Sequence, residues 1–233
     1  MLDIIYRMCE NESDGNNRDF RPKWYTKQKC LKSFLTALDV ATHKLGRVVF
    51  LHDGPGDILL NMIPNKYEVV KIDKRRNYDS LVKAYEIADG LTGDLYFVED
   101  DYLHLQDSIL KIATILPKFN LVSGYDHYSR YDPIKHTGEK DIDYKVQIVF
   151  DDETNHHWRT IESVCHTFAI TRELYNRAQP VIRHPECISH DRNLFRALWS
   201  NNVPLWTPVP GLTTQIDPYM SPGIDWEGFN KNV

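Results

Sequence analysis

The chain lacks long apolar runs. No stretch of its 233 residues approaches the roughly 18 consecutive apolar residues that a membrane-spanning helix needs. The N-terminus opens directly into an apolar segment, without the positively charged stretch that precedes the apolar part of a secretory signal. These two absences predict a cytoplasmic protein with no membrane span.

Cysteine is also scarce. The chain has 4 cysteines, and they lie far apart in the sequence, at Cys9, Cys30, Cys165 and Cys187. A disulfide framework is typical of short secreted chains with closely spaced cysteines, whereas widely spaced thiols are typical of a reducing compartment. The cysteine pattern therefore agrees with a cytoplasmic location.

Positive charge is not in excess, because 28 Lys and Arg face 33 Asp and Glu, which gives a formal net charge of -5. Surfaces that bind nucleic acid are usually basic, so this balance argues against nucleic acid as the main partner. The chain has no internal repeat and no low-complexity segment. With 42% hydrophobic and 26% charged residues, the composition is ordinary for a globular protein, and we expect one domain over residues 1–233.

The most informative stretch is an apolar segment that ends in three acids. Residues 95–98 have the length and the aromatic and β-branched content of a buried strand, and the acidic triplet Glu99, Asp100 and Asp101 follows at once. Adjacent carboxylates repel one another, so they stay ionised more easily beside a cation. Clustered carboxylate oxygens suit Mg²⁺ or Mn²⁺, ions that commonly accompany phosphorylated ligands. The pattern predicts a metal and phosphate site, and the alternative is a solvated turn.

Apolar periodicity predicts strands that alternate with helices. The predicted strands are residues 2–8, 48–51, 67–72, 95–98, 121–123, 146–150 and 164–170, and the predicted helices lie around residues 30–38, 81–88, 109–116 and 194–199. Residues 13–19 are predicted to form a polar loop, which leads through residues 21–24 to the first helix. This alternation favours an open α/β sheet, largely parallel and covered by helices on both faces.

Polar residues follow several of the predicted strands. They are Glu10, Asp53, Asp73 with Asn77, and the acidic triplet. In open α/β sheets, ligands bind beyond the carboxyl ends of the strands, so we expect these residues to line one crevice. Residues 125–145 are polar and rich in tyrosine, as expected of a loop that shapes a ligand site.

Further short motifs accompany the acidic triplet. They are Arg7 at the end of the first strand, Asp53-Gly54-Pro55 after the second, Asn77 with Ser80, His190-Asp191 at the start of a late helix, and the tail from Ser221 to Trp226. In this order the motifs resemble those of small single-domain glycosyltransferases of the GT-A type, which take a sugar from a nucleotide-sugar donor. The resemblance implies a Rossmann-like, mixed and mostly parallel sheet, with residues 1–105 as the nucleotide-binding half and residues 106–233 as the acceptor-binding half.

The resemblance also implies roles on the donor side. Glu99 or Asp100 would contact the ribose of a UDP-sugar, and Asp101 would bind Mn²⁺ or Mg²⁺ on the diphosphate. Such an ion stabilises the negative charge that develops as the nucleoside diphosphate leaves. The base and ribose would be surrounded by Arg7, Asp53 and Asn77. Alternatively, Arg7 forms a surface ion pair, Asp53 is a turn residue and Asn77 is a helix cap.

On the acceptor side, the resemblance makes Asp191 the base of an inverting transfer to a glycan, lipid or protein acceptor. The alternative is that Asp191 is an acid favoured by the helix dipole, or orients the acceptor in a retaining enzyme. In the Pro- and Gly-rich tail, we expect Asp225 and Trp226 to bind the acceptor, because an indole face matches the C–H face of a pyranose. The sequence leaves the oligomeric state open.

The chain departs from the GT-A pattern at one metal ligand. The family often supplies a histidine near the C-terminus, and the comparable position, after Thr213-Thr214, is Gln215. An amide oxygen binds a hard cation more weakly than an anionic ligand does, and Asp217 or a water molecule is the alternative ligand.

Two other clusters could bind metal. Residues 151–153, Asp-Asp-Glu, also follow an apolar strand, but the sequence there favours a hairpin turn over a metal site. His184, Cys187 and His190 have a spacing that zinc accepts, although such a set without a fourth partner is more often incidental.

Two other functions also fit the acidic triplet. A metal-dependent phosphoesterase or nuclease would need clustered acids too, although the net charge of -5 disfavours a nucleic-acid substrate. A non-catalytic binder of nucleotide sugars or glycans is the third reading, which the glutamine at position 215 favours.

Overall fold

The structure is a computed structural model, and it describes residues 1–10, 21–131 and 146–233. The polar loop predicted at 13–19 and residues 132–145 of the predicted Tyr-rich loop lie outside the described residues. Among the helices that are described, none is long and apolar enough to cross a membrane.

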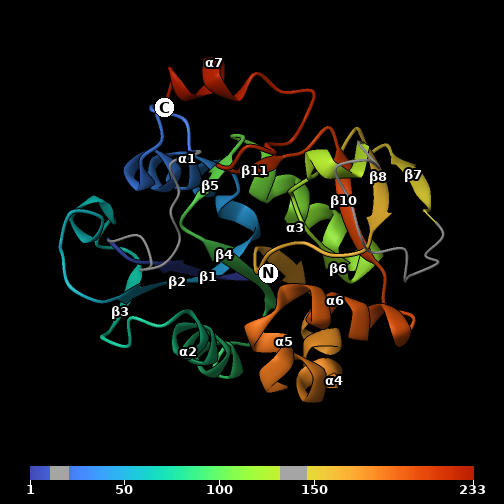
Figure 1. The fold of residues 1–233 in the computed structure, drawn as a ribbon, viewed down its shortest axis with the longest axis horizontal. Helices are drawn as coiled ribbons and strands as arrows, with labels where there is room; N and C mark the ends of the chain where they lie inside the picture. The colour runs from blue at the N-terminus through green and yellow to red at the C-terminus, as the bar shows by residue number, and fades with distance from the viewer. Residues whose placement is uncertain (11–20, 132–145) are drawn as a thin grey trace.

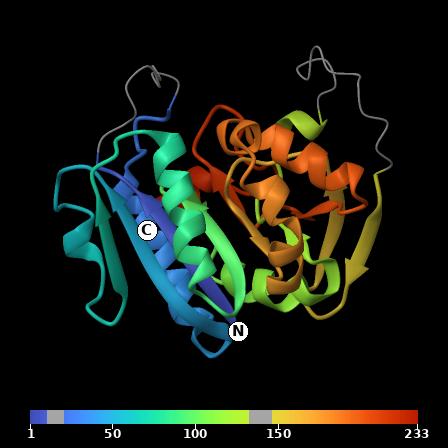
Figure 2. The same ribbon diagram turned by 90° about the horizontal axis from the view of Figure 1, so that it is seen from below.

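A sheet of 9 strands forms the centre of the described structure. In sheet order the strands are β3 (Glu68–Ile72), β2 (Leu45–Asp53), β1 (Leu2–Met8), β4 (Asp94–Glu99), β9 (Phe168–Ile170), β6 (Leu121–Val122), β10 (Leu205–Val209), β8 (His156–Ile161) and β7 (Ile148–Asp151). Strands β9 and β8 pair antiparallel with both of their neighbours, and the other neighbouring pairs are parallel. The sheet is therefore mixed, with most strands pointing one way, and it runs from the teal β3 side to the yellow β7 in Figure 2.

Helices cover both faces of this sheet (Figure 1). They are α1 (Lys27–Val40), α2 (Asn77–Asp89), α3 (Ser108–Phe119), α4 (Arg172–Ile182), α5 (Pro185–Ser189) and α6 (Asp191–Ser200). The short helix α7 (Trp226–Asn230) lies farther from the sheet, beyond α1 (Figure 1). Side chains of a strand alternate between its faces. In β1, Ile4 joins the core layer that contains Phe34 of α1, whereas Ile5 joins the layer that contains Tyr85 of α2. Because β1 is buried on both faces, its sequence reads as a continuous apolar run.

A second, 2-stranded sheet lies beside the acidic triplet. It pairs β11 (Thr213–Gln215) antiparallel with β5 (Tyr102–His104), which begins directly after the triplet. The C-terminal tail then packs Ile216 and Trp226 against Cys30 of α1 and Leu103 of β5. Residues far apart in the sequence are thereby brought to the end of β4.

The structure confirms the first four predicted strands, which correspond to β1, β2, β3 and β4. The strand predicted over residues 164–170 is confirmed only in its last part, because β9 covers Phe168–Ile170. Strands β8 and β10 and helix α4 were not predicted. The hairpin partner of β7 is β8, whose segment carries few apolar side chains besides the fully buried Trp158.

The hairpin turn predicted after residue 150 is confirmed. Asp151 accepts hydrogen bonds from the backbone N–H of Thr154 at 2.8 Å and from its hydroxyl at 2.7 Å. The next residue, Asn155, has a φ of 52°, a left-handed conformation that asparagine tolerates. The acids of this segment therefore shape a turn, and Asp151 also forms an ion pair with Lys118.

A buried carboxylate fixes the amino ends of the central strands. Asp3, which is 4% exposed, accepts hydrogen bonds from the backbone N–H groups of Arg47 at 2.7 Å, Thr92 at 3.1 Å and Gly93 at 2.7 Å. A Cβ atom at Gly46 would lie 2.1 Å from the same carboxylate, so glycine permits the close approach. These bonds tie β1 to β2 and to the loop before β4, which helps to set where the carboxyl ends of the strands meet.

We expect Asp3→Ala to destabilise the protein strongly, because it removes the acceptor of these N–H groups. The free energy of unfolding, measured by urea denaturation, should fall by about 3 kcal/mol or more, at about 1–3 kcal/mol for each unsatisfied group. The control is Asp39→Ala, whose side chain is 71% exposed and pairs with a surface lysine. An equal loss in both variants would contradict the role of Asp3.

Candidate functional site

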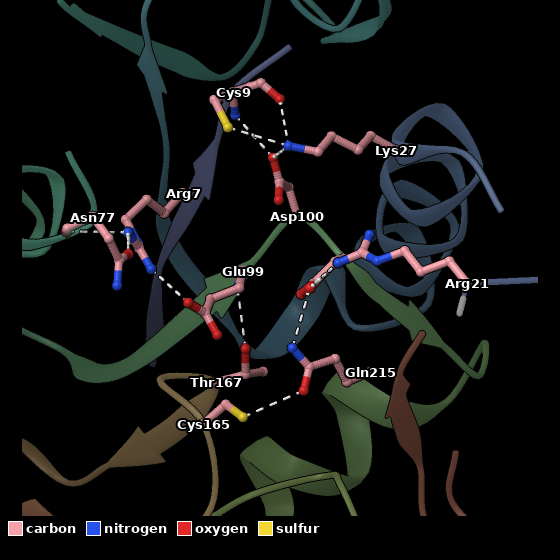
Figure 3. Close-up of polar contacts among 11 residues, drawn as sticks. Arg7, Cys9, Arg21, Lys27, Asn77, Glu99, Asp100, Cys165, Thr167 and Gln215 are labelled. Carbon is pink, nitrogen blue, oxygen red and sulfur yellow. Dashed lines mark hydrogen bonds and ion pairs between the residues drawn. The ribbon is translucent and has the colours of Figure 1, made fainter. Parts of the chain in front are cut away.

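The site lies at the carboxyl ends of β1 and β4, where Arg7 stands opposite Glu99 in the strand register. The guanidinium of Arg7 donates hydrogen bonds to Glu99 Oε1 at 2.5 Å and to Asn77 Oδ1 at 2.5 Å (Figure 3). Asn77 is the first residue of α2, so the helix start, the strand β1 and the acidic triplet meet here. The structure thus brings together three residues that the sequence placed around the nucleotide.

Asp100 is held by the start of α1 and by the end of β1. Its Oδ2 accepts hydrogen bonds from the backbone N–H of Cys9 at 2.8 Å and from Lys27 Nζ at 3.0 Å. Lys27 also donates to the carbonyl oxygen of Cys9 at 2.9 Å, and its Nζ lies 3.1 Å from the Cys9 sulfur. Lys27 is 8% exposed, so its ammonium group is enclosed between the start of α1 and the end of β1.

Asp101 is held by two N–H donors. Its Oδ2 accepts hydrogen bonds from Arg21 Nη2 at 2.7 Å and from Gln215 Nε2 at 3.1 Å (Figure 3). The amide orientation of Gln215 is fixed from both sides, because its Oε1 accepts from the thiol of Cys165 at 3.3 Å. In addition, the backbone N–H of Ile216 donates to the carbonyl oxygen of Asp101 at 2.9 Å, which fastens the C-terminal segment to the triplet.

Each acid of the triplet therefore has its own cation. Burial raises the pKa of Glu99 to about 7, Arg7 opposes the rise, and the negative charges of Asp101 and Asp191 add to it. Burial also raises the pKa of Asp100, and Lys27 opposes that rise. For Lys27, burial lowers the pKa, but the nearby Asp100 and Cys9 outweigh it and hold the pKa above its usual range. Lys27 is thus charged at neutral pH.

Asp191 is the first residue of α6. Its carboxylate accepts from the backbone N–H of Arg192 at 2.6 Å, as an acid in a first helical turn does. Burial raises its pKa, while the N–H of Arg192 and the thiol of Cys165 oppose the rise. The charge of Asp191 contributes to the raised pKa of Glu99, so the two carboxylates lie within electrostatic reach of each other.

Asp53 shapes a turn beyond the strand end. Its Oδ1 accepts from the backbone N–H groups of Lys74 at 2.7 Å and Arg75 at 3.0 Å, and the residue is 8% exposed. Arg75 has a φ of 56°, a conformation that these bonds help to hold. Asp53 thus orders the segment before α2, and within the described parts of the chain no hydrogen bond or ion pair joins it to the acidic triplet.

The two acceptor residues predicted in the tail have structural contacts. Asp225 caps α7 by accepting from the backbone N–H of Gly228 at 2.9 Å. Trp226 is 3% exposed, its Nε1 donates to the carbonyl oxygen of Ser221 at 2.8 Å, and its ring packs on the edge of Phe229. The indole face is buried, so in this structure it does not present a surface on which a sugar could stack.

The other candidate metal clusters do not form. In residues 1–10, 21–131 and 146–233, no group of three or more His, Cys, Asp or Glu is placed to hold a metal ion. His184, Cys187 and His190 lie along the short helix α5 and its two caps, and Cys187 is buried. Asp217, the alternative ligand, accepts from the backbone N–H of Tyr219 at 2.6 Å, and burial, with a contribution from Asp101, raises its pKa to about 6.

The surroundings of Asp101 also do not fit the divalent ion that the sequence predicted. Mg²⁺ and Mn²⁺ take oxygen ligands, whereas Oδ2 of Asp101 faces the N–H groups of Arg21 and Gln215. The side chains of the ion pair Arg21–Asp101 are 6% and 7% exposed. Breaking a buried ion pair costs about 3–5 kcal/mol, and an incoming metal would have to offset that cost.

Sequence reasoning missed Arg21, Lys27 and Cys165. Arg21 read as loop, and Cys165 fell within the part of the predicted strand that the structure does not confirm. Lys27 did carry a signal, because it is the first residue of α1, where the helix dipole disfavours a cation. A lysine at that position indicates a nearby acid, and the structure supplies Asp100.

The fold recurs in solved structures, although no protein-family model and no curated protein matches the sequence. One similar structure is a nucleotidyl transferase from Methanothermobacter thermautotroptrophicus, with a TM-score of 0.50, 11% identity, and coverage of 89% of this chain and 86% of that chain. Another is CMP:2-keto-3-deoxy-manno-octonic acid synthetase complexed with CTP, with a TM-score of 0.51, 11% identity, and coverage of 90% and 92%. Similarity at this identity shows the fold alone, and it confirms the predicted α/β class.

We expect Lys27→Met to destabilise the protein by about 3 kcal/mol or more, because it leaves the buried carboxylate of Asp100 without its cation. The double variant Lys27→Met/Asp100→Asn should recover most of that loss, since neither charge then remains. Urea denaturation of the wild type, both single variants and the double variant measures the coupling. Simple addition of the two single losses would show that the pair does not act as a unit.

Proposed function

We propose that the chain is a glycosyltransferase that moves a hexose from a nucleotide-sugar donor to a hydroxyl group of a glycan, lipid or protein acceptor. The observation that carries the proposal is the meeting of the acidic triplet with Arg7 and Asn77 at the carboxyl ends of β1 and β4. Ligands of open α/β sheets bind at that edge. The two similar structures have names that refer to nucleotide chemistry, which supports a nucleotide ligand. The motif order supports a UDP-sugar as the donor.

On the donor side, Glu99 would accept hydrogen bonds from the ribose hydroxyls while Arg7 holds its carboxylate in place. Asn77 accepts from Arg7 through Oδ1, which leaves its amide N–H₂ to point elsewhere, toward the base in this proposal. Asp53 would shape the base pocket indirectly, through the backbone of Lys74 and Arg75. Asp100 would support the ribose site through the end of β1.

On the acceptor side, Asp191 would take the proton of the attacking hydroxyl. The acceptor oxygen forms the new bond to C1 of the sugar, the bond from C1 to the phosphate oxygen breaks, and its electron pair leaves with the nucleoside diphosphate. A base works best when its pKa lies near the working pH, and burial raises the pKa of Asp191 in that direction. This is an inverting transfer. Because Trp226 is buried, we place the acceptor near the start of α6 and not on the tail.

Nucleotidyl transfer to a sugar is the second candidate. It is favoured by the names of the two similar structures, a nucleotidyl transferase and a synthetase complexed with CTP. That reaction attacks the α-phosphate and releases pyrophosphate, whereas the first releases a nucleoside diphosphate. A phosphoesterase or nuclease is less well supported, because the described residues present no group of acids placed for a metal.

One assay separates these functions. The protein is incubated with a panel of UDP-, GDP- and CDP-sugars, and separately with each nucleoside triphosphate and a mixture of sugars. Release of a nucleoside diphosphate from one donor supports the glycosyltransferase. Pyrophosphate from a triphosphate and a sugar favours the second candidate. Donor binding without any release would show a non-catalytic binder and contradict both.

With donor and acceptor present, we expect Asp191→Asn to lower kcat by about 100-fold or more, the usual contribution of a general base, while donor Kd stays unchanged. The matched control is Glu173→Gln, which changes an exposed acid in the first turn of the neighbouring helix α4. Turnover of Asp191→Asn within a few-fold of the wild type would remove Asp191 from the catalytic residues.

A further inference from the structure

We propose that Arg21 takes the place of a divalent cation at Asp101, so that the chain binds its nucleotide without Mn²⁺ or Mg²⁺. For the nucleotide, this inference rests on the proposed function. For the exclusion of metal, it rests only on the geometry around Asp101.

The donors that converge on Asp101 are the first argument. Arg21 Nη2 lies 2.7 Å and Gln215 Nε2 3.1 Å from Oδ2, so this carboxylate oxygen of Asp101 already accepts two hydrogen bonds. Gln215 cannot turn its oxygen toward a metal without giving up the bond from Cys165. Turning the amide would also bring its oxygen against the carboxylate of Asp101, which repels it.

The second argument is that Arg21 is fixed in place. Its guanidinium carbon lies 4.1 Å from the ring centroid of Tyr25, a cation–π contact. Tyr25 is itself tied to the same short segment, because its backbone N–H donates to the carbonyl oxygen of Pro22 at 2.9 Å. With a side chain that is 6% exposed, Arg21 is packed between this ring and the triplet.

The third argument is charge. Arg21 at Asp101 and Lys27 at Asp100 each carry one positive charge, so together they bring to the triplet the charge of one divalent ion. A guanidinium is planar, always charged and rich in N–H donors, which makes it well suited to a phosphate. In this proposal, these two cations of the chain stand beside the diphosphate where the ion would otherwise be.

Metal exclusion is tested first by Mn²⁺ binding, measured by calorimetry and by the EPR signal of free Mn²⁺. We expect the wild type to bind Mn²⁺ at least about tenfold more weakly than Arg21→Ala does, because affinity for a cation follows the charge of its ligands and Arg21 offsets the charge of Asp101. Asp101→Asn added to Arg21→Ala should abolish the gain. The matched control is Arg47→Ala, which removes an exposed arginine paired with Glu68 and should leave Mn²⁺ binding unchanged.

Two results would overturn the exclusion. One is Mn²⁺ bound by the wild type as tightly as by Arg21→Ala and lost in Asp101→Asn. The other is a folded Arg21→Ala, judged by circular dichroism, that gains no affinity. If Arg21→Ala does not fold, Arg21→Gln replaces it, because glutamine keeps an N–H donor toward Asp101 without the charge. Arg21→Lys, which keeps the charge, should still exclude Mn²⁺.

The nucleotide role is tested by the Kd of UDP and CDP with EDTA. The nucleotide Kd of the wild type should not change when EDTA replaces Mn²⁺. Arg21→Ala should bind the nucleotide more weakly than the wild type in EDTA, and Mn²⁺ should restore its nucleotide affinity. Turnover by the wild type that stops in EDTA would overturn this inference and leave the glycosyltransferase assignment intact. Absence of all turnover, with Mn²⁺ excluded as expected, would instead defeat the proposed function alone.

Discussion

The pairing of each acid of the triplet with its own cation is the interaction on which the site depends. Three neighbouring carboxylates at the end of a buried strand repel one another, and burial makes their charges more costly. The chain offsets this cost with Arg7 from β1, Lys27 from α1 and Arg21 from the segment before it. The acids therefore hold together the elements that surround them, and they do so before any ligand is present.

The two ends of the central sheet serve different purposes. At the amino ends, the carboxylate of Asp3 accepts hydrogen bonds from backbone N–H groups, so these bonds fix the strands directly. At the carboxyl ends, carboxylates form ion pairs with charged side chains. Gln215 then joins the later half of the chain to the triplet, because β11 pairs with the strand that follows it.

The parallel half of the fold could be predicted because β1 and β4 are buried on both faces and read as apolar runs. The later half was less predictable, since β8 is polar along much of its length and β9 has 3 residues. Within the site, sequence could identify acids but not their partners, because a pairing such as Arg21 with Asp101 leaves no local pattern. The Pro- and Gly-rich tail led us to expect that Trp226 stacks on a sugar, although its indole is buried in a cluster with Cys30 of α1 and Leu103 of β5.

The spacing of the charged partners along the chain has a consequence for synthesis and folding. The cations belong to the first 27 residues, and the contacts join residues 92, 80 and 73 positions apart, with Gln215 114 positions from Asp101. Contacts of such high sequence separation form slowly, because loop closure precedes any gain from the contact. On the ribosome, the basic side chains emerge well before the acids that neutralise them. We therefore expect this edge of the sheet to be among the last parts of the molecule to take shape, even though its first components are made at the outset.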